Sequence, residues 1–488
     1  MAAGTTSLIA AAIETSERPD PSSADTHPVH ARTDGDGRTA RRIAAVIGRM
    51  ISAGTLEIGI RLPTVRELSR RLGVSPTTVS EAWRSLANVG AIETRGRNGT
   101  YVRRPTGPGG PRRYRQVTEG PGHFALDLSS GTPDPLLLPD LAPIVARVGR
   151  QSLTSSYLDQ PVLPELATEI EATWPFQPAA LTVVDGALDA LDRVASEVLR
   201  LGDRVIVEHP TFPPILDLLD RLDCEAVSVD VDDEGLVLDQ LQAAVGTEAS
   251  GERDRNHAPV ALFLQPRAHN PAGIAMSPRR AKAIAGVLAR TNTIVIEDDH
   301  ANNISSAPLV SIGRWLPDRT VHIRSYSKSH GPDLRLAAVG GAGDVVTAVA
   351  NRRLLGPGWS SRILQALLLE LLRDPATADR MALARAAYTS RRSRVVEILA
   401  ANGVEVTGTD GINLWVAVED ERSAVVGLAA RGIGVAPGGP FLVRPDADHI
   451  RVTVGLLADD AQLADVSEHI AAASASHARG GHRTSAHR

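Results

Sequence analysis

The sequence predicts an α/β protein in which a small winged helix-turn-helix precedes a large domain built on a mainly parallel sheet. Three observations predict this fold. Residues 38–104 contain three short amphipathic helical patterns followed by a basic hairpin. Residues 105–124 have the proline and glycine density of a linker. From 125 to 473, short apolar runs alternate with helical stretches, which is typical of a buried parallel sheet covered by helices.

The composition is that of an ordinary globular chain, with 43% hydrophobic and 22% charged residues among 488. One cysteine, Cys224, excludes an internal disulfide framework and fits a reducing compartment. The chain shows no apolar run of the ~18 residues typical of a membrane span and no basic signal-peptide region. We therefore expect a cytoplasmic protein without a membrane segment. Residues 1–37 and 474–488 lack periodicity and are expected to form disordered tails.

The formal net charge of −5 conceals an asymmetry between two parts of the chain. Residues 38–104 contain 13 arginines, no lysine, four glutamates and no aspartate, which gives +9. The rest of the chain therefore carries −14, the difference between −5 and +9. A basic block of this kind favours a polyanionic partner, and the acidic remainder limits nonspecific attachment.

Within 38–104, helical patterns cover "RTARRIAAVIGRMISAGTL", "TVRELSRRLG" and "SPTTVSEAWRSLANVG". The third begins with Ser75 at the N-cap and Pro76 at the first helical position. Val79, Trp83 and Leu86 recur at helical spacing and should face the core. Any three-helix module shares such a pattern, but the charge of +9 favours the DNA-binding alternative.

Thr77 and Thr78 are small hydroxyl residues at the start of the third helix, where they suit phosphate and base-edge contacts in a DNA major groove. The stretch from "GIRLPTVRELS" to "RGRNGTYV" resembles the DNA-binding domain of the GntR regulator family almost element by element. The resemblance implies that double-stranded operator DNA is contacted by Arg66, Thr77 and Thr78. Gly99 corresponds to the wing glycine, and Arg61 is expected at the phosphate backbone.

In the larger domain, candidate polar residues follow the ends of several predicted strands. "VVDGALDAL" (183–191) is a strand, a glycine turn and a helix start, which offers backbone N–H groups to an anion. "QPRAHNPAG" (265–273) follows another strand, "VIEDDH" (295–300) ends a third, and Lys328 follows a fourth. Because the carboxyl ends of parallel strands meet at one edge of a sheet, we expect these groups to converge.

Lysine is the most informative residue type in this chain. Only two of the 52 basic residues are lysines, Lys282 and Lys328, and the other 50 are arginines. An amine can form a Schiff base with pyridoxal phosphate, whereas a guanidinium cannot. An exposed loop lysine is the simpler alternative, but the rarity of Lys328 and its neighbouring acid, amide and glycine turn favour a cofactor site.

The domain at 125–473 resembles the fold-type I aminotransferases, which have a smaller C-terminal α+β part, and the whole chain resembles a MocR-type regulator. The resemblance implies pyridoxal 5′-phosphate as the cofactor, a homodimer, and no metal. The resemblance implies that Lys328 is the catalytic, imine-forming lysine, that Asp298 contacts the pyridine nitrogen, that Asn270 contacts the ring hydroxyl and that Phe212 stacks on the ring. It implies that the phosphate is bound by Ser325, Arg335 and the backbone of Gly186, Ala187 and Leu188, and that Tyr157 contacts the phosphate of the neighbouring subunit. It also implies that Arg451 binds the carboxylate of an amino-compound effector.

Three positions depart from the family pattern. His300 takes the place of a tyrosine that contacts the ring hydroxyl, where an imidazole N–H could replace the bond. Asp185 takes the place of a phosphate-binding serine or threonine, and its carboxylate would repel a phosphate unless it turned away to cap the helix. Leu188 replaces a polar residue. These departures leave cofactor binding intact and put fast turnover in question.

The sequence leaves the function open between two main alternatives. The first is a transcriptional regulator that responds to pyridoxal phosphate or to an amino compound bound to it. The second is a working aminotransferase that carries a DNA-binding domain, and residual transaminase activity fits both. The charge of +9 favours the regulator, because an enzyme has no use for a basic winged helix. A domain that only dimerises is a third alternative, and Lys328 argues against it.

Overall fold

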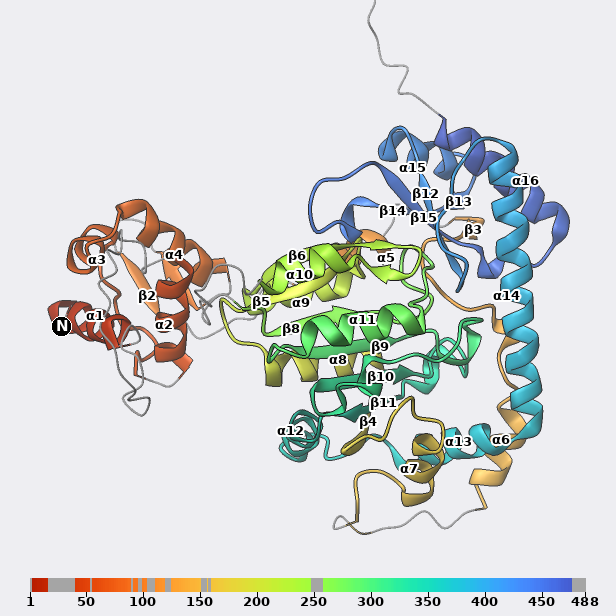
Figure 1. Cartoon of the computed structure of the whole chain (residues 1–488), viewed down its shortest axis with the longest axis horizontal. Helices are drawn as coiled ribbons and strands as arrows, with labels where there is room; N and C mark the ends of the chain where they lie inside the picture. The colour runs from red at the N-terminus through yellow and green to blue at the C-terminus, as the bar shows by residue number, and fades with distance from the viewer. Residues whose placement is uncertain are drawn as a thin grey trace, which may run out of the picture. The chain divides into compact units, whose positions relative to one another are not determined.

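The computed structural model describes residues 2–15, 40–52, 55–88, 91–94, 99–102, 110–118, 124–150, 156, 159–246 and 258–475. The chain divides into two compact units, whose helices and strands are labelled in Figure 1. The smaller unit contains Met1–Gly110 with Leu199–Asp203 and Leu219–Glu225, and the larger contains the rest. Within the described ranges, no helix is both long enough and apolar enough to span a membrane.

The N-terminal unit has the predicted winged helix-turn-helix fold. Helices α2 (Ala40–Ser52), α3 (Val65–Leu72) and α4 (Pro76–Asn88) precede an antiparallel hairpin of β1 (Ile92–Thr94) and β2 (Thr100–Val102). Val79, Trp83 and Leu86 are buried in its core, as their spacing predicted. The opposite, polar face of α4 includes the exposed Thr77.

Local capping interactions fix the turn between α3 and α4. Thr64 and Glu67 form a reciprocal capping box at the start of α3. Gly73 ends this helix with a left-handed φ of 69°, which glycine adopts without a steric penalty. The Ser75 hydroxyl accepts the backbone N–H of Thr78 (3.1 Å), as expected of an N-cap residue.

The prediction of a disordered tail at residues 1–37 is wrong for its first part. Ala2–Thr15 forms a helix, α1, that packs against α2 and α3. Ile9, Ala10 and Ile13 are fully buried in the core of the N-terminal unit. Docking of this narrow apolar face stabilises a helix that has no charged or capping pattern of its own. Residues 16–39 lie outside the described part of the chain.

The larger unit contains an eight-stranded, mostly parallel sheet in the order β4-β11-β10-β9-β8-β5-β6-β7. The strands are β4 (Ala180–Val184), β5 (Arg204–His209), β6 (Glu225–Asp232), β7 (Gly235–Leu236), β8 (Ala261–Leu264), β9 (Ile294–Asp299), β10 (Thr320–Ser325) and β11 (Ala337–Gly341). Strand β9 pairs in parallel with β8 and β10, whereas β11 runs antiparallel to β10 and β4.

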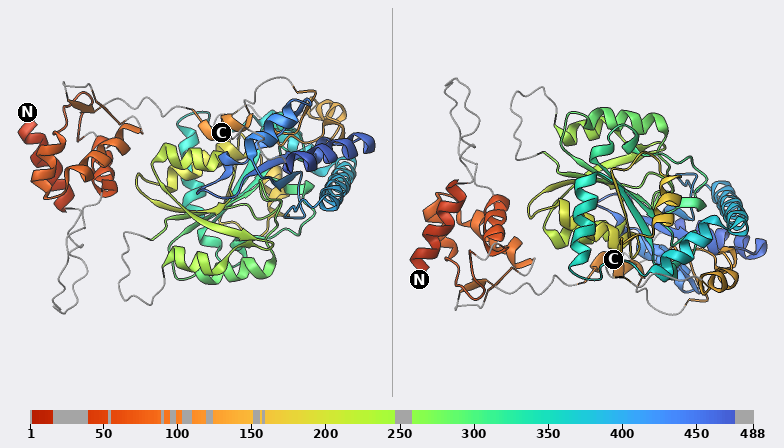
Figure 2. Two further views of the ribbon diagram at one scale, coloured as in Figure 1. Left: turned by 90° about the horizontal axis from the view of Figure 1, so that it is seen from above. Right: turned by 90° about the horizontal axis from the view of Figure 1, so that it is seen from below.

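Helices cover both faces of this sheet, as the two views in Figure 2 show. The helices of this part are α6 (Ala142–Val148), α7 (Pro164–Glu171), α8 (Ala187–Val198), α9 (Pro213–Leu222), α10 (Leu238–Val245), α11 (Pro278–Leu288), α12 (Gly343–Leu354) and α13 (Arg362–Arg373). Val205, Ile206 and Val207 of β5 are all fully buried, although successive side chains point to opposite faces. Burial on both faces explains the unbroken apolar runs in the sequence.

The C-terminal part is the expected α+β addition. Strands β12 (Asn413–Ala417), β15 (His449–Thr453) and β14 (Ala436–Pro437) form an antiparallel sheet, and β13 (Ile433–Gly434) pairs in parallel with β3 (Leu126–Asp127). The 27-residue helix α14 (Pro375–Ala401) runs along one side of the larger unit (Figure 1). Helices α14, α15 (Glu421–Ala429) and α16 (Asp460–Ser474) share an apolar core with these strands.

The prediction of an irregular linker at 105–124 is wrong for one segment. Arg112–Thr118 forms a helix, α5, and Val117 is buried against the C-terminal sheet. Val117 is the one buried residue of α5 and gives no helical periodicity, so the proline and glycine density dominated the prediction. Residues 103–109 and 119–123 lie outside the described part.

We expect Ile9→Ala to destabilise the N-terminal unit by about 2–4 kcal/mol, because it removes a fully buried side chain from the core. Backbone amides of α2 and α4 should then exchange faster with deuterium in the full-length protein. Leu8→Ala is the control, since Leu8 lies on the same helix and is 44% exposed. Equal effects of the two substitutions would mean that α1 does not contribute to the core.

Candidate functional site

The predicted cofactor residues lie along the carboxyl edge of the large sheet. Gly186 follows β4, Phe212 follows β5 and Asn270 follows β8, whereas Asp298 and Ser325 lie at the ends of β9 and β10. Strands β5, β8, β9 and β10 pair in parallel, so their carboxyl ends face the same way. The structure therefore brings these residues to one edge, as the order of strands and motifs predicted.

Strand β11 runs the other way and brings Arg335 to the same edge. Its first residue, Ala337, pairs with Ser325 at the end of β10 and with Val184 at the end of β4. The Arg335 guanidinium lies 3.3 Å from the position that a Cβ on Gly186 would occupy. Gly186 has a φ of 103°, a backbone conformation that residues with a side chain rarely adopt. The turn thus leaves the backbone at the N-terminus of α8 free of a side chain, next to the guanidinium of Arg335.

Lys328 and His300 are joined by a hydrogen bond of 3.1 Å between Nζ and Nδ1. The other ring nitrogen of His300, Nε2, lies 2.9 Å from the carbonyl oxygen of Ala268. A carbonyl can only accept, so Nε2 carries the proton and Nδ1 accepts from Lys328. Burial, together with the charge of Lys328, holds the pKa of His300 well below its ordinary value and keeps the ring neutral. The imidazole N–H is therefore directed at Ala268.

Gln265, to which the sequence analysis gave no role, connects three members of the site. Its Nε2 donates to Asp298 Oδ2 (2.8 Å), and its Oε1 accepts the backbone N–H of Asn270 (2.8 Å). Its own backbone N–H donates to Glu208 Oε2 (2.8 Å). All four residues are buried. Its place directly after β8 was the available signal, because a buried amide at a strand end must satisfy all of its hydrogen bonds.

Loss of solvation sets the charges of the central pair. It raises the pKa of Asp298 to about 6, and Asp298 Oδ1 has no hydrogen-bond partner among the described residues. Loss of solvation also lowers the pKa of Lys328 to about 8; the charge of Asp298 opposes this shift and that of Arg451 adds to it. Near neutral pH the carboxyl is mostly ionised and the amine is mostly protonated, but a larger fraction of the amine is in the neutral, nucleophilic form than for an ordinary lysine.

Arg451 lies on β15 and is 2% exposed. Its guanidinium donates to the Ser129 carbonyl and to Asn270 Oδ1 (3.4 Å), and its central carbon lies 5.3 Å from the centre of the Phe441 ring. Burial lowers the pKa of Arg451 to about 10, so it remains protonated at neutral pH. Asn270 thus links Arg451 to the part of the site that contains Gln265.

Asp185 is neutralised by an arginine that no local sequence signal identified. Its carboxylate lies 3.1 Å from Arg353 of α12, which is 1% exposed and also contacts Asp189 (3.1 Å). The backbone N–H of Asp185 donates to Asp189 Oδ2 (3.2 Å). The repulsion expected between Asp185 and an anion is therefore offset by an ion pair in which Arg353 is buried and the Asp185 side chain is 46% exposed, and Asp189 rather than Asp185 caps the turn.

The remaining predicted residues are placed as follows. Ala187 and Leu188 lie in the first turn of α8, and Phe212 is half-buried between β5 and α9. The Ser325 hydroxyl accepts the backbone N–H of Ser327 (3.3 Å). Tyr157 lies outside the described residues.

These residues fit pyridoxal phosphate. Asp298 Oδ1 is buried and unpaired among the described residues, and it could accept the proton of a pyridinium nitrogen. The Gly186 turn, with Arg335 against it, suits a phosphate at a helix N-terminus. The desolvated amine of Lys328 suits an aldehyde.

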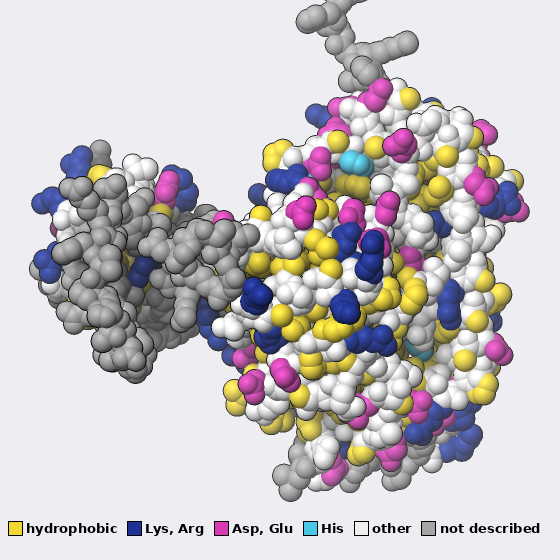
Figure 3. Space-filling model, in the orientation of Figure 1, with side chains coloured by type: hydrophobic (Ala, Val, Ile, Leu, Met, Phe, Trp, Pro, Cys, Tyr) yellow, Lys and Arg dark blue, Asp and Glu magenta, His cyan; other side chains and the backbone are white. Residues whose placement is uncertain are grey.

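The predicted DNA-contacting residues lie on α3, α4 and the hairpin. Arg66 on α3 and Thr77 on α4 are exposed, and the Thr78 hydroxyl is hydrogen-bonded to the N-cap residue of α4 (2.8 Å). Gly99 has a φ of 101°, which residues other than glycine rarely adopt, and it lies beside the Arg61 guanidinium. The face of the larger unit seen in Figure 3 instead intersperses acidic and basic side chains. The predicted DNA contacts all lie in the N-terminal unit.

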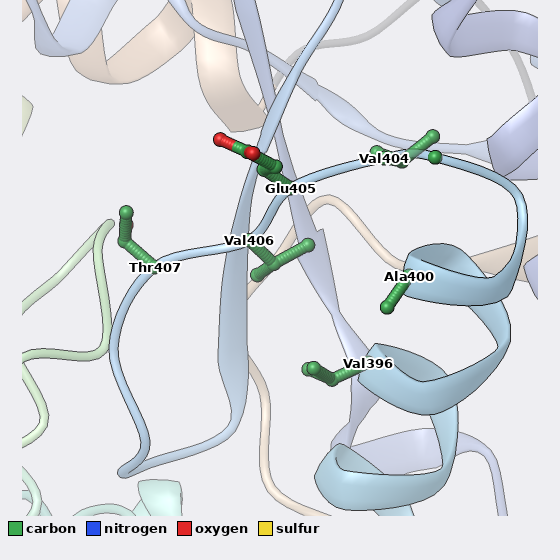
Figure 4. A pocket seen from close by; sticks show the side chains of 7 residues that line it. Val396, Ala400, Val404, Glu405, Val406 and Thr407 are labelled. Atoms are coloured by element: carbon green, nitrogen blue, oxygen red, sulfur yellow. The ribbon is translucent and has the colours of Figure 1, made fainter.

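A hollow in the C-terminal part has no connection with these residues (Figure 4). It is lined by Val396, Ala400, Gly403, Val404, Glu405, Val406 and Thr407. Its walls are mainly apolar and include one carboxylate. Unlike the site at the sheet edge, its described lining includes no lysine and no glycine turn at a helix N-terminus.

The fold and the site define a class of protein, in which a winged-helix DNA-binding unit precedes an aminotransferase-type domain. Residues 39–102 match the bacterial regulatory proteins of the gntR family, and residues 125–470 match the family of aminotransferases class I and II. The chain belongs to the MocR-type transcriptional regulators, which combine these two domains.

Two relatives match nearly the whole chain. The vitamin B6 salvage pathway transcriptional repressor PtsJ of Salmonella typhimurium is 36% identical over 433 residues, which cover 87% of this chain and 96% of PtsJ. The HTH-type transcriptional regulator TauR of Rhodobacter capsulatus is 27% identical over 463 residues, which cover 83% of this chain and 90% of TauR.

Solved aminotransferases share the fold of the larger domain. Kynurenine aminotransferase of Pyrococcus horikoshii has a TM-score of 0.66 and 19% identity, over 74% of this chain and 93% of that chain. The α-aminoadipate aminotransferase LysN of Thermus thermophilus, complexed with N-(5′-phosphopyridoxyl)-L-leucine, has a TM-score of 0.64 and 20% identity, over 74% and 94%.

We expect Gln265→Leu to lower the free energy of unfolding of the larger unit by about 1–3 kcal/mol, because it leaves buried partners of Gln265 without hydrogen bonds. Urea unfolding followed by tryptophan fluorescence measures the change. Gln240→Leu is the matched control, since Gln240 makes the same kind of contact with Asp230 (2.9 Å) at an exposed position. A loss for Gln240→Leu as large as that for Gln265→Leu would contradict the importance of burial.

Proposed function

We propose that the larger domain of this transcriptional regulator binds pyridoxal phosphate through Lys328, and that binding changes the affinity of the winged helix for DNA. One observation carries the proposal: a desolvated amine interacts with a buried carboxylate that has an unpaired oxygen, in a chain with a winged helix. A purely structural role does not explain why a desolvated lysine is found at position 328, because desolvating an ammonium is costly and a guanidinium would fill a structural role better.

Each site residue has a role toward the cofactor in this proposal. Pyridoxal phosphate supplies an aldehyde that condenses with amines and a ring that withdraws electrons. Asp298 would hold a proton at the ring nitrogen, and its orientation is fixed by Gln265. The other proposed contacts are Asn270 at the ring hydroxyl, Phe212 at the ring face, and Ser325, Arg335 and the backbone of Gly186, Ala187 and Leu188 at the phosphate, with Tyr157 contributed by a second subunit.

The hydrogen bonds of His300 favour binding over fast turnover. Its N–H is donated to Ala268, so it offers Lys328 an acceptor and offers the ring hydroxyl no donor. A tyrosine in this place could donate instead. Slow transaminase activity is compatible with the proposal. Turnover at about 1–10³ per second, as in ordinary enzymes, would favour the alternative of a working aminotransferase.

The relative PtsJ supports a link to vitamin B6. Because PtsJ is named as a repressor of vitamin B6 salvage, we infer that this chain controls genes that supply the same cofactor. The signal would be pyridoxal phosphate, or its adduct with an amino compound whose carboxylate binds Arg451. A regulator of double-stranded operator DNA acts in the cytoplasm, where that DNA is accessible.

We also infer that the protein acts as a homodimer. Apolar side chains are exposed on α6, α12, α13 and the short helix η2 (Pro135–Leu137): Leu136, Leu141, Val145, Leu354, Leu355 and Ile363. Helices α6 and α13 pack against each other, so part of this set lies together. Exposed apolar groups of this size favour a protein partner. A second copy suits helix-turn-helix proteins, which bind paired half-sites as dimers.

Mixing the protein with pyridoxal phosphate should produce a visible absorbance band that depends on Lys328. The neutral amine is the reactive form, so the rate of band formation should rise with pH through about 8, where Lys328 loses its proton, and level off above it. Lys328→Arg should abolish the band although it keeps the charge. Lys282→Arg, at an exposed position on α11, should leave the band unchanged. A band that survives in Lys328→Arg would refute the assignment.

Arg66→Ala and Thr77→Ala should each weaken binding to duplex DNA from the region upstream of the protein's own gene by about 1–3 kcal/mol. The affinity should also fall steeply with salt, because phosphate contacts release counterions. Gel-shift titration at two salt concentrations measures both effects. Arg422→Ala, which removes an exposed arginine from α15, should have no effect. Full affinity in both Arg66→Ala and Thr77→Ala would exclude this DNA-binding surface.

Leu355→Asp should shift the protein from dimer toward monomer, because it places a charge at a side chain that is 90% exposed in the single chain and would be buried in the dimer. Sedimentation velocity at several concentrations measures the shift. Val426→Asp is the control, since Val426 is 60% exposed on α15, away from this set of helices in the sequence. An unchanged dimer in Leu355→Asp would remove α12 from the interface.

A further inference from the structure

Helix α5 is a short element that connects the two units of the chain. It contains seven residues, Arg112–Thr118, and the smaller unit ends just before it at Gly110. An isolated helix of this length is unstable in water, because the cost of nucleation outweighs the few hydrogen bonds gained. Contacts with the larger unit must therefore hold α5 in its helical form.

The first of these contacts is made by α9. The Asp217 carboxylate accepts the backbone N–H groups of Arg113 (3.0 Å) and Tyr114 (2.8 Å). These two donors belong to the first turn of α5, where the helix itself supplies no acceptor. Asp217 thus acts as a cap from another part of the chain. Helix α9 begins directly after Phe212, which follows β5. Asp217 is therefore held by a helix that starts at the carboxyl edge of the large sheet.

The second contact is made by the C-terminal part, next to Arg451. Val117 is 5% exposed and shares an apolar core with Trp415 and Phe441. Trp415 pairs with Arg451 in the register of β12 and β15, and the Arg451 guanidinium lies against the Phe441 ring. Tyr114 lies close enough to Arg451 that its ionised form would oppose the fall in the pKa of Arg451 that burial causes. Phe441 therefore belongs to the apolar core that holds Val117 and also lies against the Arg451 guanidinium.

We propose that binding of a ligand carboxylate at Arg451 releases α5 from its contacts with the larger unit. This release would transmit the binding event to the DNA-binding unit. This inference rests on the proposed function, because it needs a pyridoxal phosphate adduct that carries a carboxylate. A carboxylate attracts a guanidinium more strongly than an aromatic ring does, so it would draw Arg451 away from Phe441. The packing around Val117 then changes, and the N–H groups of Arg113 and Tyr114 separate from the Asp217 carboxylate as α5 leaves its position.

Release of α5 would change the length of the connection between the units. Seven residues span about 10 Å as a helix at ~1.5 Å per residue. They span up to about 23 Å when extended at ~3.3 Å per residue. The tether of each winged helix would gain about 13 Å, so the spacing of half-sites that a dimer can reach would widen.

Hydrogen exchange at residues 113–115 of the full-length protein tests the proposal. These amides are bonded to Asp217 or to the Pro111 carbonyl when α5 is seated. We would compare the free protein, the protein with pyridoxal phosphate, and the protein with N-(5′-phosphopyridoxyl)-L-leucine, which adds a carboxylate. The last should accelerate exchange by about fivefold or more, the effect of losing a helix cap, and pyridoxal phosphate alone should not. In Arg451→Ala the acceleration should disappear.

Two variants separate docking of α5 from ligand binding. Asp217→Ala should accelerate exchange about fivefold without any ligand, because it removes the cap. It should leave the absorbance band of bound pyridoxal phosphate unchanged. Gln116→Ala, at an exposed position of the same helix, should alter neither quantity.

The possible failures are distinguishable. Absence of an absorbance band in the native protein would overturn the proposed function. A normal band with unchanged or slower exchange in the presence of phosphopyridoxyl-leucine would overturn only the role of α5. Exchange that is unaltered in Asp217→Ala would also overturn it, because α5 would then not depend on this anchor.

Discussion

The hydrogen bonds of Gln265 are the constraint on which the rest of the site depends. An amide has a donor end and an acceptor end, and here Nε2 bonds to Asp298 while Oε1 bonds to Asn270. Only one orientation of the amide satisfies both. That orientation engages one carboxylate oxygen of Asp298 and leaves the other unpaired among the described residues. It also fixes the backbone of Asn270, whose side chain contacts Arg451. The orientations of the residues that would hold the ring and the effector therefore follow from one buried side chain.

Much of the site was predictable because it follows from strand direction. Polar residues after buried strands converge when the strands are parallel, and this rule located Lys328 and the segments that contain Asn270 and Asp298. Interactions between distant parts of the chain were not predictable in this way. Arg353 pairs with Asp185 across 168 positions, and no periodicity links them. The donor direction of His300 depends on a carbonyl that becomes visible only once the chain is folded.

Two helices escaped prediction for the same physical reason. Both α1 and α5 lack strong periodicity, and each is stabilised by docking rather than by its own sequence. In α1 the buried face consists of Ile9, Ala10 and Ile13, and in α5 a single residue, Val117, is buried. A sequence pattern reports a helix that covers a wide apolar surface, and it misses one held by a few contacts. Composition alone then favours tail or linker, as it did here.

The pairing of Arg353 with two aspartates limits how firmly the turn at Gly186 can hold an anion. Arg353 pairs with Asp185 and Asp189, and Asp189 also pairs with Arg193 (2.8 Å), so these four residues together carry no net charge. Attraction for a phosphate is left to the exposed Arg335 and to the backbone at the start of α8. Water and salt weaken an exposed charge. These contacts hold the phosphate weakly, so occupancy of the proposed cofactor site would follow the free concentration of pyridoxal phosphate, whereas a permanently loaded enzyme stays occupied.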